Sequence, residues 1–159
     1  YHKLGITAGA LVRRNFTNKW SAQFEILYIQ KGSIHNPDPN SGDYFYYLLK
    51  LDYIEVPVLI KYEYKKILFE SGIGFGRLIF ENENADNVDI TGQRPFNKYE
   101  VSVQLGAGYP LLKNFEANVR YSYSALPIRP IPGTDYFLNF GHSHNNGICI
   151  TLKYLFGKN

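Results

Sequence analysis

The chain has 159 residues, the length of one domain, and its net charge of +3 is far below that of a protein that neutralises many phosphates. Hydrophobic residues make up 45% of it and charged residues 19%, with an abundance of tyrosine, phenylalanine and glycine that favours strands over helices. No run approaches eighteen apolar residues, which excludes a membrane-spanning helix. The lone Cys149 excludes an internal disulfide and a thiolate zinc site. We therefore expect a single β domain over residues 1–159, without a nucleic-acid partner.

Apolar and polar residues alternate along most of the chain, which predicts strands with one apolar face each. In chain order the predicted strands cover residues 4–12, 20–28, 44–64, 67–80, 97–109, 114–125 and 148–156. Within 44–64 the apolar positions change parity after Leu51, which predicts a bulge near Asp52. Pro57, inside the same strand, has no amide hydrogen and needs a bulge or a locally unpaired position.

The connections between these strands differ in length at the two ends. Short turns at residues 13–19, 64–66 and 110–113 alternate with long polar loops at residues 33–43, 81–96 and 126–146. Outer-membrane barrels have this asymmetry, with short periplasmic turns and long extracellular loops.

The polar faces of the strands carry large charged residues mixed with glycine and serine, which suits a narrow polar lumen. The candidates for a lumen charge network are Glu25, Glu55, Lys61, Glu100, Glu116, Arg120 and Lys153. Charges buried in a lumen must neutralise one another, because an unpaired buried charge is expensive. We expect Glu100, Glu116 and Arg120, which share the inward parity, to belong to one hydrogen-bonded network, and we interpret the network as a structural plug, with a proton or ion path as the alternative.

Aromatic residues on the apolar faces predict the height of the barrel. Tyr99 and Tyr109 are ten residues apart, about 33 Å along a strand, which projects to about 25 Å at a tilt of roughly 40°, the height of a lipid-facing band. The predicted lipid-interface aromatics are Trp20, Tyr28, Tyr62, Tyr99 and Tyr109. A soluble lipocalin-like barrel or a β-sandwich remains the alternative, with the apolar faces turned inward.

These patterns predict an all-β fold, an eight-stranded antiparallel up-and-down transmembrane β-barrel, of which about seven strands are in this sequence. If the strand at 148–156 ends in the periplasm, counting strands backwards places Tyr1 at the outer surface, so we expect an N-terminal strand to be missing. Eight strands make a barrel whose interior is filled by side chains, without an open channel.

Several segments resemble the PorT-like outer-membrane β-barrel family of Gram-negative bacteria. YIEVPVLIKYEY at 53–64 resembles the family's central "YLEIP" strand, and Glu55 with Pro57 is its most particular feature. FEILYIQKGS at 24–33, GIGFGRLI at 72–79 and GICITLKYLF at 147–156 are similar to other strands of the family in the same order. The resemblance implies an eight-stranded barrel in the outer membrane, and the family's named member assists protein secretion.

Two loop segments raise the question of catalysis or metal binding. His142, Ser143 and His144 suggest a lipid A deacylase-like hydrolase, but that family reads His, any residue, Ser, Asn, and no acidic partner can be assigned here. The two histidines lack a third metal ligand. The acidic stretch at 82–89 lacks the glycine and the final glutamate of an EF-hand. We therefore expect no enzymatic activity, no cofactor and no metal, and keep the hydrolase and a soluble ligand-binding barrel as alternatives.

The loop from Leu126 to Phe140 is rich in aromatic residues and proline, and exposed apolar groups often mark a contact surface. Its candidate partner residues are Pro127, Arg129, Pro130, Tyr136, Phe137 and Phe140. We expect a binding, structural or secretion and assembly component of the bacterial outer membrane. Its expected partners are outer-membrane lipid and lipopolysaccharide, together with another outer-membrane or secretion-complex protein.

Overall fold

The structure is a computed structural model that describes residues 3–86, 88–93, 95–129 and 144–156. Its strands are β1 (Thr7–Asn15), β2 (Trp20–His35), β3 (Tyr47–Tyr64), β4 (Ile67–Ala85), β5 (Val88–Asp89), β6 (Tyr99–Leu112), β7 (Phe115–Ser124) and β8 (Asn146–Tyr154). A short 3-10 turn, η1 (Pro39–Ser41), lies between β2 and β3. No helix in the described ranges is long and apolar enough to cross a membrane.

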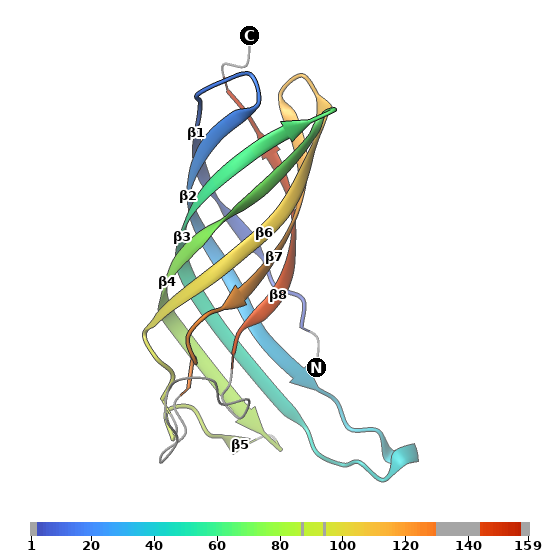
Figure 1. Cartoon of the computed structure of the whole chain (residues 1–159). Helices are drawn as coiled ribbons and strands as arrows, with labels where there is room; N and C mark the ends of the chain where they lie inside the picture. The colour runs from blue at the N-terminus through green and yellow to red at the C-terminus, as the bar shows by residue number, and fades with distance from the viewer. Residues whose placement is uncertain (1–2, 87, 94, 130–143, 157–159) are drawn as a thin grey trace.

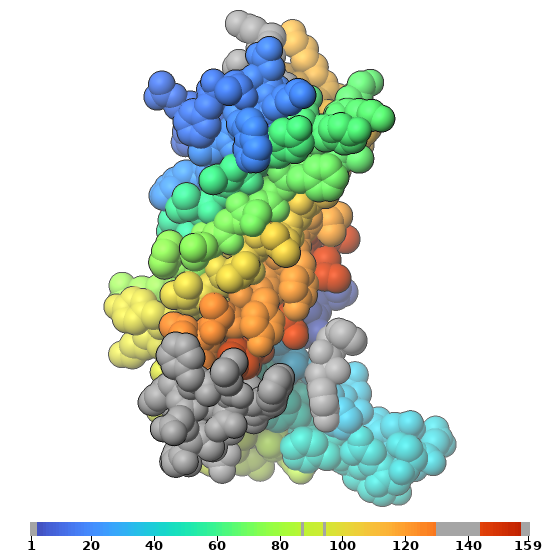
Figure 2. Space-filling view, viewed as in Figure 1, coloured from blue at the N-terminus to red at the C-terminus, as the bar shows by residue number. Residues whose placement is uncertain are grey.

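The long strands form one antiparallel sheet in the order β1-β2-β3-β4-β6-β7-β8, and the two-residue β5 pairs with the far end of β4. Figure 1 shows that the sheet is curled, with tilted strands and three tight turns at the upper end. We call this end the short-turn end and the opposite one the long-loop end. In Figure 2 the strands run diagonally across the visible outer wall. The all-β antiparallel barrel fold predicted from the sequence is confirmed.

The sheet has two edges, β1 and β8, which pair only with β2 and β7 among the described residues. Neighbouring strands run in opposite directions, and six such steps lead from β1 to β8. Because six is an even number, β1 and β8 run in the same direction. One further strand, antiparallel to both, would close the curled sheet into an eight-stranded barrel, since such barrels have an even number of antiparallel strands.

The apolar faces of the strands point outward and the charged faces point inward. Val119 and Ile150 are 50% and 78% exposed, whereas Glu100 and Arg120 are 3% and 6% exposed. A soluble barrel has the reverse arrangement, because water would solvate the charges and the apolar side chains would form the core. An apolar outer wall around a polar interior is the pattern of a transmembrane barrel.

The register shift lies where the sequence predicts it, but the extra residue is on the neighbouring strand. Asp52 pairs with Phe80 and Tyr53 pairs with Leu78, so Ile79 of β4 is the bulged residue. The β3 strand keeps one parity, and its apolar residues beyond the bulge point into the barrel. At Pro57 the β2–β3 pairing is interrupted, which is the locally unpaired position that the missing amide hydrogen requires.

Several strands are longer than predicted. β2 continues to His35 and β4 to Ala85, so the predicted loops at 33–43 and 81–96 begin later, and β1 and β6 each extend three residues into the predicted turns. β3 has 18 residues and β4 has 19, whereas about 9–11 are enough to cross a bilayer. The β2–β3–β4 sheet therefore continues beyond the membrane at the long-loop end, where its backbone ladder no longer depends on an apolar face.

A small apolar cluster closes the barrel at the long-loop end. Leu51 and Tyr53 of β3 pack there with Phe96 and Ile128, which come from the connections after β5 and β7. The Asn97 amide donates a hydrogen bond to the Ile128 carbonyl at 2.7 Å, which joins these two connections. We call these four buried residues the mouth plug. Leu51, on the side of the parity change toward the barrel mouth, thus belongs to a cap inside the barrel, and Leu49 packs against it.

Candidate functional site

Arg120 of β7 is the centre of a charge network in the half of the lumen nearer the short-turn end. Its Nη1 and Nη2 donate to the two oxygens of Glu25 on β2 at 2.8 and 2.9 Å, and its Nε donates to Glu70 on β4 at 2.6 Å. Because β2, β4 and β7 are not neighbours in the sheet, these bonds cross the lumen. The guanidinium geometry suits this task, since its donors point in several fixed directions.

Three further cations complete the network. Lys61 Nζ lies 2.7 Å from Glu116 and 3.0 Å from Glu70, and Lys153 Nζ lies 3.1 Å from Glu25. Arg13 of β1 pairs with the other oxygen of Glu116 at 2.8 Å. We call this set the main charge network, and its members are Arg13, Glu25, Lys61, Glu70, Glu116, Arg120 and Lys153.

The sequence-based candidates for the lumen missed two of these members. Glu70 follows outward-facing Phe69 in an alternating strand, so its position in the sequence already indicated an inward-facing side chain. Arg13 was assigned to a turn, and only the continuation of β1 to Asn15 makes it an inward-facing strand residue. Space for these long side chains comes from glycine: a Cβ on Gly106 of β6 would lie 2.9 Å from Glu70 Oε1.

The prediction that Glu100 shares a network with Glu116 and Arg120 needs correction. Glu100 and Glu55 both pair with Lys31, at 2.8 Å each, in a separate outer charge cluster. Arg120 on β7 pairs with Gly106 on β6. Gly106 is six residues from Glu100, a distance of about 20 Å along the strand. Parity places a residue in the lumen, but register along the strand decides the depth at which it lies.

The two groups balance each other in charge. The main charge network contains four cations and three carboxylates, and the outer charge cluster contains one cation and two carboxylates. Together they are neutral, as a buried set of charges must be to avoid a large desolvation cost. Gln104 donates a hydrogen bond to Glu55, and Asn145 donates one to Glu100 at 2.8 Å, so neutral amides supply further donors in the outer charge cluster.

The predicted interface aromatics lie at both ends of the outer wall. Trp20 packs against Tyr62 near the short-turn end, with ring centroids 4.8 Å apart, and Tyr109 lies at the same end of β6. Tyr99 lies at the other end of β6, and Tyr28 donates its hydroxyl hydrogen to Asp52 at 2.9 Å. The two groups lie at the two boundaries expected of a lipid-facing band.

At the long-loop end, Arg129 and Glu83 form an ion pair beside the mouth plug. The Arg129 guanidinium also stacks over the Phe96 ring at 3.8 Å, and Tyr47 donates its hydroxyl hydrogen to Glu83 at 2.6 Å. Burial and the Glu83 carboxylate raise the pKa of the Tyr47 hydroxyl, because both disfavour a second negative charge.

The predicted partner loop therefore differs from expectation where the structure describes it. Pro127 and Ile128 are buried and Arg129 turns toward Glu83, because these residues close the mouth of the barrel. They do not form an exposed apolar surface. The other residues of that prediction, Pro130, Tyr136, Phe137 and Phe140, lie outside the described residues.

The outer membrane protein beta-barrel domain family matches residues 1–127 of the chain, which includes β1 to β7. The chain belongs to this family. No curated protein and no solved structure matches it. Membership places the protein in the bacterial outer membrane, in agreement with the apolar outer wall and the charged lumen. The short-turn end of this outer-membrane barrel is then the periplasmic end, and the long-loop end is extracellular.

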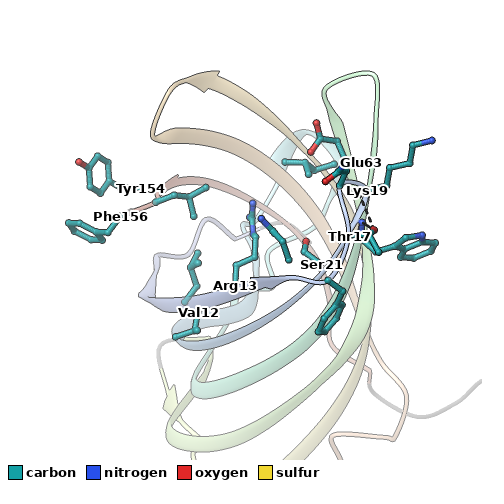
Figure 3. A pocket seen from close by; sticks show the side chains of 15 residues that line it. Val12, Arg13, Thr17, Lys19, Ser21, Glu63, Tyr154 and Phe156 are labelled. Atoms are coloured by element: carbon teal, nitrogen blue, oxygen red, sulfur yellow. Dashed lines mark hydrogen bonds between the residues drawn. The ribbon is translucent and has the colours of Figure 1, made fainter. Parts of the chain in front are cut away.

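A hollow of about 770 Å³ opens at the periplasmic end of this outer-membrane barrel. Figure 3 shows Val12 and Arg13 on one side of it and Tyr154 and Phe156 on the other. Ser21 of β2 and Glu63 of β3 line the same hollow, so it is the periplasmic mouth of the lumen, bounded on one side by the β1 and β8 edges. The hollow is therefore the open end of the lumen rather than a closed ligand pocket.

The histidine segment has one described member. The Nδ1 of His144 lies 3.0 Å from the Ser124 carbonyl oxygen, and its ring stacks on Tyr123 with centroids 5.4 Å apart. His142 and Ser143 lie outside the described residues. Cys149 points inward, with Sγ 3.5 Å from Thr7 Oγ1. Within the described ranges, no three His, Cys, Asp or Glu residues are grouped as a metal site would require.

The acidic stretch at 82–89 binds its own backbone and neighbours. Asp86 accepts a hydrogen bond from the Tyr46 amide at 2.9 Å, and Asp89 accepts one from the Thr91 amide at 2.9 Å. Hydrogen bonds from the Thr91 side chain and the Thr91 amide lower the pKa of Asp89, because they stabilise its charged form. These two carboxylates thus have local structural partners, while Glu83 belongs to the ion pair beside the mouth plug.

Proposed function

We propose that this outer-membrane barrel is a non-enzymatic binding and assembly component that acts through its extracellular part, with a lumen that serves stability. The main support is the cross-lumen bonding. Arg120 joins β7 to β2 and β4, and Lys61 joins β3 to β4 and β7. A solute path would have to break these buried ion pairs, each of which is costly to separate inside a low-dielectric interior.

The surface that suits a partner is the outer β2–β3 hairpin, comprising residues 30–52. It extends past the barrel mouth in Figure 1, and its tip exposes Tyr44 at 75% and Phe45 at 47%. Exposed aromatic residues at such a site supply contact area at a small cost in side-chain entropy. The tip is held in shape, since Asp43 accepts a hydrogen bond from the Phe45 amide and lies 2.6 Å from His35.

The proposed partner is another outer-membrane or secretion-complex protein. The likeness of residues 53–64 to the central strand of the PorT-like barrels supports this choice. That resemblance lies in a strand of the barrel wall. In our proposal, the outer β2–β3 hairpin and its loops carry the role in secretion.

The test is purification from outer membranes in mild detergent with the Tyr44→Ser/Phe45→Ser double variant. The wild-type barrel should copurify with a partner in a fixed ratio, and the double variant should lose it while the barrel stays folded. Tyr64→Ser, which changes an exposed aromatic residue at the periplasmic end, is the matched control and should retain the partner. A wild-type barrel that purifies alone would contradict the proposal.

Enzymatic activity is tested separately by release of acyl chains from lipopolysaccharide. We expect no release by the wild-type protein, because the described His144 contacts a carbonyl and an aromatic ring. Release that disappears in His142→Ala and His144→Ala would replace our proposal with a lipid A deacylase-like function.

A further inference from the structure

A groove of about 810 Å³ opens on the outer wall of the barrel, at the extracellular boundary of the lipid-facing band, and reaches inward to Phe96 of the mouth plug. Its floor is apolar and includes Ile54 and Val56 of β3, Phe75 of β4 and Tyr99 of β6. These three strands lie side by side in the sheet (Figure 1). The bulged Ile79 of β4 also lines the groove, and a bulge bends its strand and interrupts the regular wall.

The depth of the groove follows from the register. Arg77 pairs with Tyr99 on β6 and lies ten residues from Ile67, the first residue of β4. Ten residues of a strand tilted by roughly 40° span about 25 Å across the membrane, which is the full height of the apolar band. Arg77 is therefore at the level of the outer-leaflet headgroups, while Val56 and Phe75 lie deeper, at the level of acyl chains.

The rim of the groove is cationic and its charges are not compensated. Arg77 and Lys98 both line it and are exposed, and neither side chain has a hydrogen bond or ion pair within the part of the chain that the structure describes. The Lys50 ammonium lies over the Phe80 ring, 5.5 Å from its centroid, and Phe80 is also a lining residue. The lining carboxylate, Glu81, pairs with inward-facing Leu51, so it belongs to the lumen side.

We propose that this groove binds one phosphorylated glycolipid of the outer leaflet, the lipid A part of lipopolysaccharide. Its phosphates would contact Arg77 and Lys98, since guanidinium and ammonium groups form charge-assisted hydrogen bonds with phosphate. One of its acyl chains would lie on the floor made by Val56 and Phe75. A zwitterionic phospholipid fits less well, because its own ammonium group would face an uncompensated cationic rim.

The experiment uses the purified barrel in phosphatidylcholine nanodiscs, titrated with fluorescent bisphosphorylated lipid A, and native mass spectrometry to count bound lipid. We expect one lipid A per barrel. The Arg77→Gln/Lys98→Gln variant should bind it about tenfold or more weakly, because two charged hydrogen-bond donors are lost. Arg14→Gln/Lys113→Gln removes the same charge at the periplasmic end and should bind as the wild type does.

A second variant separates groove occupancy from charge. Val56→Trp should fill the floor and weaken lipid A binding with all cations present, whereas Val103→Trp, on the lipid-facing wall outside the groove, should leave binding unchanged. Heat-modifiable electrophoresis reports whether each variant is folded. The proposal is overturned if phosphate-free lipid A binds as tightly as the bisphosphorylated form, if the Arg77/Lys98 variant keeps wild-type affinity, or if the Arg14/Lys113 control is weakened equally.

Discussion

Removal of Arg120 should be among the most damaging single substitutions in the barrel. Its guanidinium makes two hydrogen bonds to Glu25 and one to Glu70, and all three side chains are buried. In Arg120→Leu both carboxylates stay buried with less compensation. Breaking a buried ion pair by deleting one partner costs about 3–5 kcal/mol, because the remaining charge is neither solvated nor paired.

The cost should fall at the lower end of that range. Glu25 keeps Lys153 at 3.1 Å, and Glu70 keeps Lys61 at 3.0 Å, so neither carboxylate is left alone. With a urea dependence of about 2 kcal/mol per molar, a loss of about 3 kcal/mol lowers the unfolding midpoint by about 1.5 M. The assay is urea unfolding in lipid vesicles, followed by heat-modifiable electrophoresis.

The decisive control is the double variant Glu25→Leu/Arg120→Leu. Replacing a whole buried pair by apolar residues is often neutral or stabilising, so this variant should be more stable than Arg120→Leu alone. Arg14→Leu, at an exposed position on β1, should shift the midpoint by less than about 0.3 M, since surface substitutions are usually within about 0.5 kcal/mol. If Arg120→Leu unfolds at the same urea concentration as Arg14→Leu, the main charge network is not what stabilises the lumen.

Three further predictions concern other parts of the barrel. Gly72→Ala would place a Cβ against the backbone carbonyl oxygen of Val58 on the neighbouring strand, and should destabilise the barrel by about 1–3 kcal/mol in the same urea assay; an unchanged midpoint would contradict the packing. The Phe45 amide, and to a smaller extent His35, lowers the pKa of Asp43, so its stabilisation of the hairpin tip is present above the unfolded pKa of about 3.9 and is lost as pH falls through the folded value. Hydrogen exchange corrected for intrinsic rates should show the Phe45 amide losing protection below about pH 4, and constant protection would refute this. Arg129→Ala should raise the hydrogen-exchange rate of the Asn97 amide, which donates to the Ile128 carbonyl, without changing exchange in β7. Equal protection of this amide in the variant and the wild type would show that the Arg129–Glu83 ion pair does not hold the mouth closed.

The sequence by itself determined the strands and the side of the sheet on which each residue lies. Alternation with a period of two is a local property of a strand, and lipid outside with charge inside imposes it on every spanning segment. Val119 and Ile150 could therefore be assigned to the outer wall, and Arg120 to the lumen, without any knowledge of contacts. The same logic covers Glu70, whose parity was visible in the sequence.

Only the tertiary structure decided which of these residues meet. Arg120 and Glu25 are on strands that are not neighbours, and the curl of the sheet and the register of each strand bring them together across the lumen. Register also assigns Glu100 to Lys31 instead of Arg120, although both share the inward parity. The inward turn of Ile128 depends on the shape of the barrel mouth. Alternation fixes a face, but depth and partner depend on curvature and strand offset, which no local pattern records.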